Sequence, residues 1–164
     1  MLKNAGTSIT QIGFVIRDGE KVKQGMKALF GLSPAKTRLT CEDDARRYHG
    51  APGDFQAELL YYQFGALELE FILPLHGQSI WQDFLDLHGE GLHHIQIAAA
   101  DCDLLSAELS ALGVSVIQEG ASVSNIPGAK WQYYDLSPAL PFILEAFDGN
   151  AKAAALEAQE GKPS

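Results

Sequence analysis

The chain has 164 residues, of which 46% are hydrophobic and 20% charged, the ordinary range for globular proteins. Its net charge of −9 argues against nucleic acid or an anionic membrane as a partner, because both repel an acidic protein. No apolar run approaches the roughly 18 residues of a membrane span and no signal pattern is visible, so the cytoplasm is the expected location. Cys41 and Cys102 are too few and too far apart for a disulfide framework or a thiolate zinc site, and we expect reduced thiols.

In chain order, the first half predicts a strand, a capped helix and three further strands. Residues 9–16 are rich in β-branched and aromatic residues, as strands are. Asp18 is a candidate N-cap for a helix with apolar residues at helical spacing, which ends at Gly31. The polar stretch that follows predicts a loop with one short strand, and two longer strands lie around Gly65 and end at Pro74. The three strands are expected near 36–41, at 55–64 and at 67–73.

The second half repeats this order, and self-similarity of this kind indicates a duplicated unit. A strand at 92–98 is followed by a helix that Asp101 or Asp103 caps and Gly113 ends. Between the halves, a short helix is expected from Ser79 to Gly89. The residues after Asp148 are rich in Ala, Glu and Gln and predict a loosely attached helix or a frayed end. The remaining strands are expected at 114–118, 131–135 and 142–147.

The repeat predicts an α+β fold in which two βαβββ modules form one cupped β-sheet domain. The first module spans 8–76 and the second 91–147. Residues 77–90 form a helical linker between them, and 148–164 form a C-terminal tail.

Two glutamates stand inside apolar strand candidates, where a charge is unusual. Glu145 shares a strand face with Phe147, because strand side chains alternate. An ionised carboxylate on a buried face is costly unless it is paired or binds a metal. Glu70 poses the same question beside Glu68 in strand 67–73. The alternatives are an edge strand that leaves Glu145 in solvent, and an amphipathic strand with both other glutamates in water.

The first strand of each half carries a further polar candidate. His93 and His94 are expected to point to opposite faces of strand 92–98, so at most one of them serves a given site. A strand histidine is also compatible with a structural role in the core. Gln11 is a weaker candidate, because an amide is a neutral and poor ligand.

The repeat places four of these residues equivalently. Gln11 and His94 occupy the same place in the first strand of each half, and each precedes an isoleucine. Glu70 and Glu145 occupy the same place in each last strand. If the modules pack about a pseudo-twofold axis, the four side chains converge on one point. Two carboxylates, an imidazole and an amide predict a site for one divalent Mn, Co, Ni, Mg or Zn ion, with positions left for water or substrate.

At these residues the sequence resembles the vicinal oxygen chelate superfamily, also called the glyoxalase/bleomycin-resistance/dioxygenase group. The resemblance covers about residues 8–147, and within 67–97 the segments LELEFILPL, GQSIWQDFL and HGEGLHHIQI look like methylmalonyl-CoA epimerase. It implies Glu70, His94 and Glu145 as metal ligands. Glutamine stands where that family has its remaining histidine, which is similar to some lactoylglutathione lyases and implies Gln11 as the fourth ligand.

The resemblance implies an isomerase or lyase that abstracts a proton next to a carbonyl group. A methylmalonyl-CoA epimerase-like enzyme comes first and lactoylglutathione lyase (glyoxalase I) second, so the substrate is expected to be an acyl-CoA or a glutathione adduct. Glu145 is the implied base, and Asp54, counted back from Glu70, is the candidate for a second base. Relatives in the superfamily also imply a homodimer.

A third hypothesis belongs to a different class, a metal-free binding or resistance protein. Aromatic side chains would line its cleft, although aromatic residues in strands are commonly core. Two converging glutamates argue against it, because they repel each other without a cation. The aromatic candidates are Trp81, Trp131, Tyr133 and Tyr134.

Overall fold

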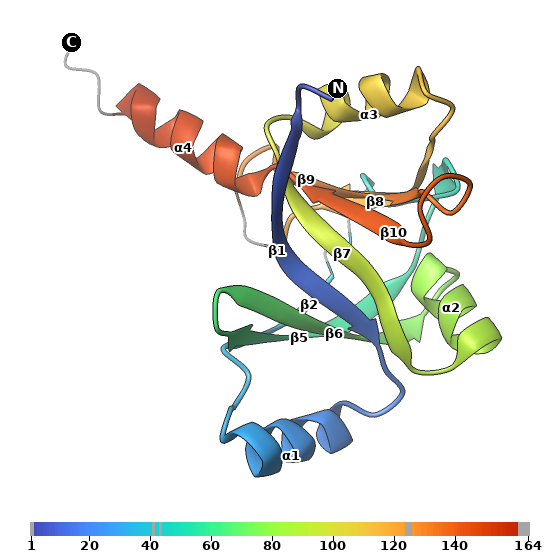
Figure 1. Cartoon of the computed structure of the whole chain (residues 1–164), viewed down its shortest axis with the longest axis vertical. Helices are drawn as coiled ribbons and strands as arrows, with labels where there is room; N and C mark the ends of the chain where they lie inside the picture. The colour runs from blue at the N-terminus through green and yellow to red at the C-terminus, as the bar shows by residue number, and fades with distance from the viewer. Residues whose placement is uncertain (1, 41, 43, 124–125, 161–164) are drawn as a thin grey trace.

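The computed structural model in Figure 1 describes residues 2–40, 42, 44–123 and 126–160. Four helices lie among these residues: α1 (Gly19–Phe30), α2 (Ile80–His88), α3 (Cys102–Ser110) and α4 (Gly149–Glu160). The strands are β1 (Ala5–Val15), β2 (Lys36–Leu39), β3 (Arg47–Tyr48), β4 (Ala51–Pro52), β5 (Gln56–Phe64), β6 (Leu67–His76), β7 (Gly91–Ala99), β8 (Val116–Ala121), β9 (Lys130–Asp135) and β10 (Ile143–Phe147).

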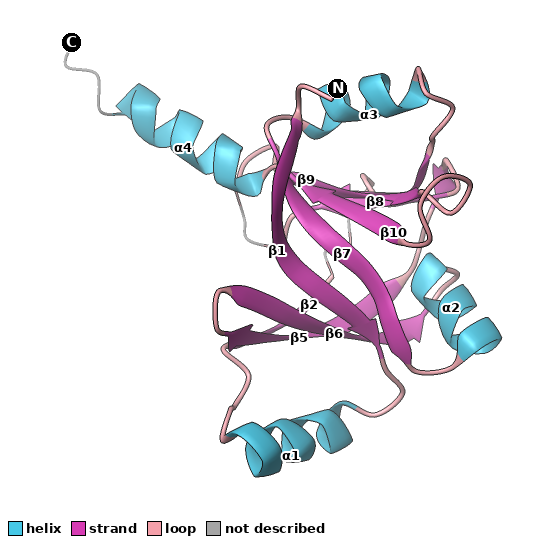
Figure 2. Cartoon of the chain, in the orientation of Figure 1, coloured by secondary structure: helices cyan, strands magenta, loops and turns pink. Residues whose placement is uncertain are grey.

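All ten of these strands belong to one curled sheet, with the order β2-β5-β6-β1-β7-β10-β9-β8-β3-β4 (Figure 2). Strands β1 and β7 pair antiparallel near its centre, and each also pairs in parallel with the last strand of its own half, β6 or β10. The order β2-β5-β6-β1 is therefore mirrored by β8-β9-β10-β7. This arrangement confirms the predicted fold class, while the boundaries 8–76, 77–90, 91–147 and 148–164 stay a prediction.

The helices begin at the residues that the sequence identifies as caps. The side chains of Asp18, Ser79 and Asp101 each accept a hydrogen bond from the backbone N–H three residues later. Gly31 ends α1 in the left-handed conformation, with φ of 70°. The predicted helical tail is present as α4, which leads away from the sheet in Figure 2.

The apolar core lies in three clusters that fix the curvature of the sheet. The helix α1 packs Met26 against Leu60 of β5, and α3 packs Leu105 against Leu144 of β10. The third cluster joins α2 to both halves of the sheet through an aromatic group that includes Trp81 and Trp131. Helices α1 and α3 cover the outer side of the two halves, and the inner side holds this aromatic group together with the polar residues described below.

Three local expectations need correction. Pro74 does not end its strand, because a register shift between Gln56 and Ala57 of β5 accommodates the missing N–H, and β6 continues to His76. The second strand of the second half runs from Val116 to Ala121 rather than over 114–118.

The polar stretch 33–53 also contains more structure than a single short strand. Besides β2, it forms the hairpin β3–β4, whose Tyr48 pairs with Gln118 of β8 in the other half. Strands of two residues are too short to show an alternation of apolar and polar residues, so the sequence does not predict this long-range pairing. Of the two cysteines, Cys102 is buried and free, and Cys41 lies outside the described residues.

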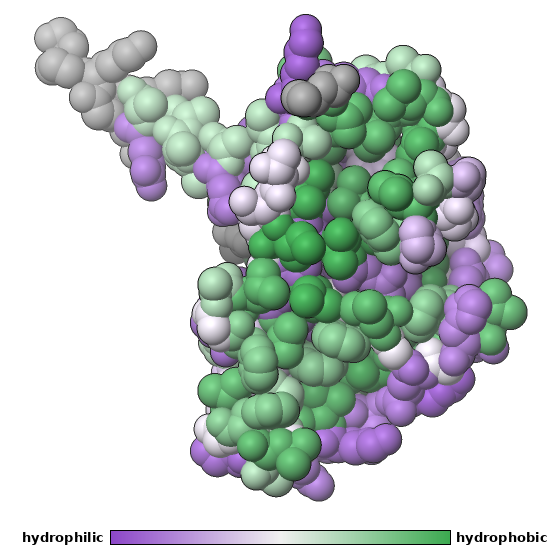
Figure 3. All heavy atoms as spheres, in the orientation of Figure 1, coloured by the Kyte–Doolittle hydropathy of each residue, from purple (hydrophilic) through white to green (hydrophobic). Residues whose placement is uncertain are grey.

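Apolar residues cover much of the face of the molecule seen in Figure 3. Large apolar side chains that are exposed include Leu29, Phe30, Phe64 and Leu92. Patches of this kind are common at protein contacts, and the homodimer stays a prediction. Within the described ranges, none of the helices has the length and apolar character needed to cross a membrane.

Candidate metal centre

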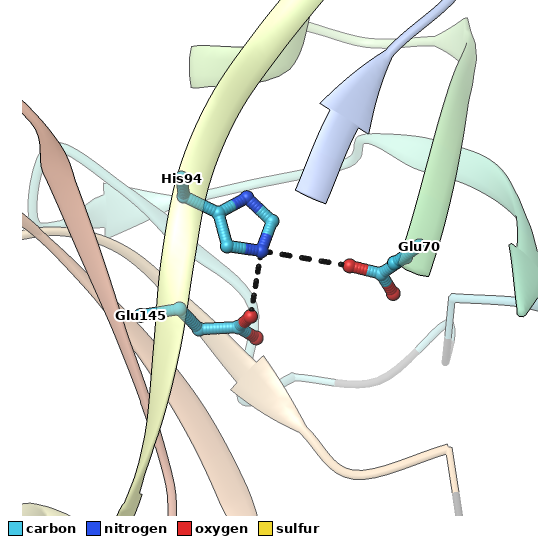
Figure 4. Close-up of side chains that lie close together, drawn as sticks. All are labelled: Glu70, His94 and Glu145. Carbon is cyan, nitrogen blue, oxygen red and sulfur yellow. Dashed lines mark ion pairs between the residues drawn. The ribbon is translucent and has the colours of Figure 1, made fainter. Parts of the chain in front are cut away.

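Three strands bring Glu70, His94 and Glu145 together inside the curled sheet (Figure 4). They come from β6, β7 and β10, and their exposed fractions are only 5%, 1% and 5%. The Nε2 atom of His94 lies 2.9 Å from Oε2 of Glu145 and 3.7 Å from Oε2 of Glu70. One potential ligand atom of each residue lies within 4.8 Å of the others, so the three can surround a single ion.

The pairing register explains why these positions converge. Glu70 of β6 lies opposite Gly13 of β1, two residues after Gln11. Glu145 of β10 lies opposite Gln96 of β7, two residues after His94. The equivalence of Gln11 with His94, and of Glu70 with Glu145, is therefore present in the hydrogen-bonding pattern of the sheet as well as in the sequence.

Gly13 provides the space that the His94 ring occupies. The two residues lie opposite each other in the β1–β7 pair, and a Cβ atom built on Gly13 would overlap the imidazole of His94. Any side chain at this position would therefore push the ring away from Glu70 and Glu145. Glycine is required here for close approach rather than for an unusual backbone conformation.

A β-bulge at His93 overturns the expectation that the two histidines point to opposite faces. Gly13 pairs with His94 but the next residue, Phe14, pairs with Leu92, so His93 is the extra residue of the bulge. Both histidines are buried, and their Nδ1 atoms lie 3.1 Å apart. Simple strand alternation fails at this point because the bulge turns consecutive side chains inward.

Gln11 lies in the same cavity but its amide already has partners. Its Nε2 donates to Oε1 of Glu68 at 2.9 Å, and its Oε1 accepts from Nε2 of Gln96 at 3.0 Å. The Gln96 amide also donates to Oε2 of Glu145 at 2.9 Å. Gln11 is therefore connected to Glu145 through the side-chain amide of Gln96. Its role as a fourth ligand stays a prediction.

Each carboxylate of the cluster also has a tyrosine directly opposite it on the neighbouring strand. Tyr61 of β5 pairs with Glu70, and Tyr133 of β9 pairs with Glu145. Hydrogen bonds with these phenols lower the pKa values of the two carboxyl groups, against the larger effect of burial. The two halves of the sheet therefore support their glutamates in the same way.

Burial decides the charges of the cluster. Burial first, and then the charge of Glu145, raises the pKa of Glu70 well above its ordinary value. Burial raises the pKa of Glu145 to about 8, and burial lowers the pKa of His94 to about 3. A divalent cation offsets both the desolvation of the carboxylates and their mutual repulsion, so this donor set favours one.

The imidazole of His94 fits a metal in a second respect. Its Nε2 atom is buried between two carboxylates yet makes no well-aligned hydrogen bond with any described residue. A buried ring nitrogen without such a partner is unusual, and a metal ion is one group that satisfies it. The residues present therefore fit a divalent ion.

A cavity of about 90 Å³ opens beside the cluster. This space holds a few water-sized groups, so a larger substrate would have to extend out of it. Polar lining residues include Gln11, Lys36, Glu68, Glu70, Gln96, Ser122 and Glu145. Of the aromatic residues suggested for a binding cleft, Trp81, Trp131 and Tyr133 line it, whereas Tyr134 packs in the core with α3.

Asp54 does not reach this cavity. It is exposed, in the loop before β5, and it is absent from the described residues that line the space. Counting back along the chain from Glu70 fails here because the stretch 33–53 forms the hairpin that docks on the other half. The structure does not support Asp54 as the second base.

Sequence reasoning overlooked two residues of this site. Gln96 shares a strand face with His94, and Glu68 shares one with Glu70, so two-residue spacing from each candidate ligand identifies both. Glu68 is nevertheless a quarter exposed, as its side chain meets Lys36 at 3.4 Å near the mouth of the cavity.

Comparison with known proteins gives the same picture. The sequence matches the Glyoxalase/Bleomycin resistance protein/Dioxygenase superfamily over residues 10–133. A curated relative, the uncharacterized protein YqjC of Bacillus subtilis strain 168, is 36% identical over 63 residues, which are 38% of this chain. The match spans 43% of the length of that relative.

Solved structures share the fold over most of their length. A methylmalonyl-CoA epimerase from Mycobacterium tuberculosis is 17% identical with a TM-score of 0.67, covering 94% of this chain and 96% of that one. A variant of the Streptomyces coelicolor epimerase in complex with 2-nitronate-propionyl-CoA is 21% identical, with a TM-score of 0.64 and coverage of 87% and 94%. A hypothetical protein from Bacillus halodurans C-125 is 17% identical, with a TM-score of 0.65 and coverage of 86% and 93%.

Proposed function

The chain belongs to the Glyoxalase/Bleomycin resistance protein/Dioxygenase superfamily, and we propose that it is a divalent-metal-dependent enzyme that abstracts a proton next to a carbonyl group. The observation that carries this proposal is the buried Glu70–His94–Glu145 cluster. An epimerase-like reaction on an acyl-CoA is the first candidate. It is supported by the shared fold with epimerases, one of which was solved with 2-nitronate-propionyl-CoA.

Glu70, His94 and Glu145 are the proposed ligands of a Mn, Co, Ni, Zn or Mg ion, because the set combines hard oxygen donors with one imidazole and no thiolate. A bound ion supplies the positive charge that stabilises the oxygen of an enolate. Gln11 would join the ligands through its amide oxygen, which accepts a hydrogen bond from Gln96 and has a second lone pair for an ion.

Glu145 is the proposed base on one face of the substrate. The C–H bond next to the carbonyl breaks, its electron pair enters the enolate, and the proton goes to a carboxylate oxygen of Glu145. Burial raises the pKa of this carboxyl to about 8 in the metal-free chain, and a bound divalent ion would lower it, so that the ionised form is present to take the proton. The amide of Gln96 holds one of its oxygens in place.

Glu68 is the proposed acid–base group for the other face, in place of Asp54. It lines the same cavity, and it lies at the far end of the hydrogen-bonded amide pair that connects it through Gln11 and Gln96 to Glu145. Inversion at carbon requires a proton from the face opposite Glu145. Glu68 in its acid form gives that proton to the enolate, while Glu145 keeps the proton that it removed.

The epimerase assignment predicts exchange of the substrate's α-proton with solvent. Purified protein loaded with Co²⁺ is incubated with methylmalonyl-CoA in deuterated water, and deuterium incorporation and epimerisation are followed by mass spectrometry and chiral analysis. Activity is expected to disappear in the E145Q variant and to persist in E157Q, which changes an exposed glutamate of α4. An absence of both exchange and epimerisation in the loaded wild-type protein would rule out this substrate.

A lactoylglutathione lyase-like enzyme is the second candidate, and Gln11 is the observation that favours it. Its amide lines the cavity, and by the sequence resemblance it stands where some lactoylglutathione lyases have a glutamine ligand. Formation of lactoylglutathione from the methylglyoxal–glutathione hemithioacetal tests this activity on the same protein. If elemental analysis finds no metal and added metals do not raise the melting temperature, the metal-free binding protein replaces both enzymes.

The role of Glu68 predicts an asymmetric defect in E68Q. Epimerisation is expected to fall by about 10²-fold or more, the usual effect of losing an acid–base group. The enantiomer whose proton faces Glu145 should still exchange deuterium, because that base can return the label to the same face. The other enantiomer should not exchange. Equal exchange from both enantiomers, or an unchanged rate of epimerisation, would contradict the assignment.

A further inference from the structure

The two adjacent histidines share a hydrogen bond that has to be consistent with metal binding. The Nδ1 atoms of His93 and His94 lie 3.1 Å apart, and the bulge in β7 holds both rings inside the protein. His93 packs edge-to-face with Phe84 of α2 and with Tyr133 of β9, so its ring has little freedom to rotate. Its position is therefore fixed independently of any metal.

A bond between two neutral imidazoles allows only two proton arrangements. If Nδ1 of His93 carries the proton, then the Nε2 atom of His94 carries one too, and it cannot bind a metal. If Nδ1 of His94 carries the proton, its Nε2 presents a lone pair between Glu70 and Glu145. Only the second arrangement makes His94 a ligand.

The surroundings of His93 are suited to the second arrangement. In that state the proton of the His93 ring is on Nε2, on the side of the ring away from His94. None of the described residues donates a hydrogen bond to that Nε2 atom, so the atom can carry the proton.

We propose that His93 is a positioning residue that holds His94 in its metal-binding tautomer by accepting a hydrogen bond from Nδ1–H of His94. This inference rests on the proposed metal site. A metal-bound histidine commonly donates its other ring proton to a fixed acceptor, and removal of that acceptor weakens metal binding by about 10- to 100-fold. Here the acceptor is the neighbouring histidine, and the β-bulge is what places it within reach.

Two variants separate the acceptor from the volume of the ring. H93F keeps an aromatic ring among Phe84 and Tyr133 but removes the acceptor. H93N keeps an acceptor, because the amide oxygen of asparagine falls near the position of the histidine Nδ1. The dissociation constant for Zn²⁺ is measured by competition with a chromophoric chelator. We expect it to rise by about 10- to 100-fold in H93F and to be largely restored in H93N.

H88F serves as the control, because His88 is an exposed histidine of α2 and its loss should leave the Zn²⁺ dissociation constant unchanged. The ¹⁵N chemical shifts of the Zn²⁺-loaded wild-type protein report the tautomer without any substitution, and His94 should carry its proton on Nδ1. A proton on Nε2, wild-type affinity in H93F, or equal losses in H93F and H93N would each overturn the inference. Wild-type protein that binds no Zn²⁺ overturns the proposed function as well, so the two failures are distinguishable.

Discussion

The G13A variant is expected to lose metal binding by about 10²-fold or more while only one methyl group is added. The new Cβ atom would occupy the space of the His94 imidazole, so the ring must turn away from Glu70 and Glu145. With the ligands no longer converging, the Zn²⁺ affinity measured by chelator competition should fall. Activity should fall with it.

The matched control is G25A. Gly25 lies within α1 and a Cβ atom there meets no other atom, so this change should leave metal binding intact and stabilise the helix by about 0.5–1 kcal/mol. Because G13A changes a buried position, a double-mutant cycle with H94A separates the clash from general damage. G13A should cost much less stability in the H94A background than in wild type. Equal costs in the two backgrounds, or unchanged affinity in a folded G13A, would contradict the explanation.

Much of the fold could be predicted because its signals are local. Capping residues identify the starts of α1, α2 and α3, a left-handed glycine identifies the end of α1, and two-residue alternation identifies the long strands. The hairpin β3–β4 could not be predicted in this way, since each of its strands has two residues and the hairpin is held by the pairing of β3 with β8. Its docking on the opposite half of the sheet also removes Asp54 from the place that chain counting gave it.

The residues of the candidate site that occupy equivalent places in the two halves could be predicted from the sequence. The residues whose position depends on a local irregularity of one strand could not. Glu70 and Glu145 keep equivalent registers, so the duplicated pattern identifies both. The bulge at His93 breaks strand alternation, and nothing in the strand's own sequence marks it. The partners of Gln11 also depend on amide orientations that only the packed sheet defines.

Metal-free protein is expected to lose stability as the pH rises from about 6.5 to about 8, because below this window the lowered pKa values of His93 and His94 oppose the effect of the carboxyls. The pKa of Glu145 is raised to about 8 in the folded chain, and that of Glu70 is raised as well. Between the ordinary carboxyl pKa and these raised values, Glu70 and Glu145 bind more protons in the folded chain than in the unfolded chain, and above about pH 6.5 the two histidines are neutral in both states. The stability contributed by each protonated carboxyl is thus complete at low pH and lost through this window, with a slope of up to about 1.4 kcal/mol per pH unit for each group.

A bound divalent ion should invert this dependence. The ion binds the ionised carboxylates and displaces their protons, so its stabilising effect grows as the pH rises. Chemical denaturation at pH 6.5 and pH 8, with chelator and with Zn²⁺, measures both effects. E145Q should flatten the metal-free profile and remove most of the gain from Zn²⁺, because it deletes one titrating group and one ligand together. E157Q, which changes an exposed carboxylate of α4, should reproduce the wild-type profiles. If the gain from Zn²⁺ is the same at both pH values, ion binding does not displace protons from Glu70 and Glu145, and the cluster is not the metal site.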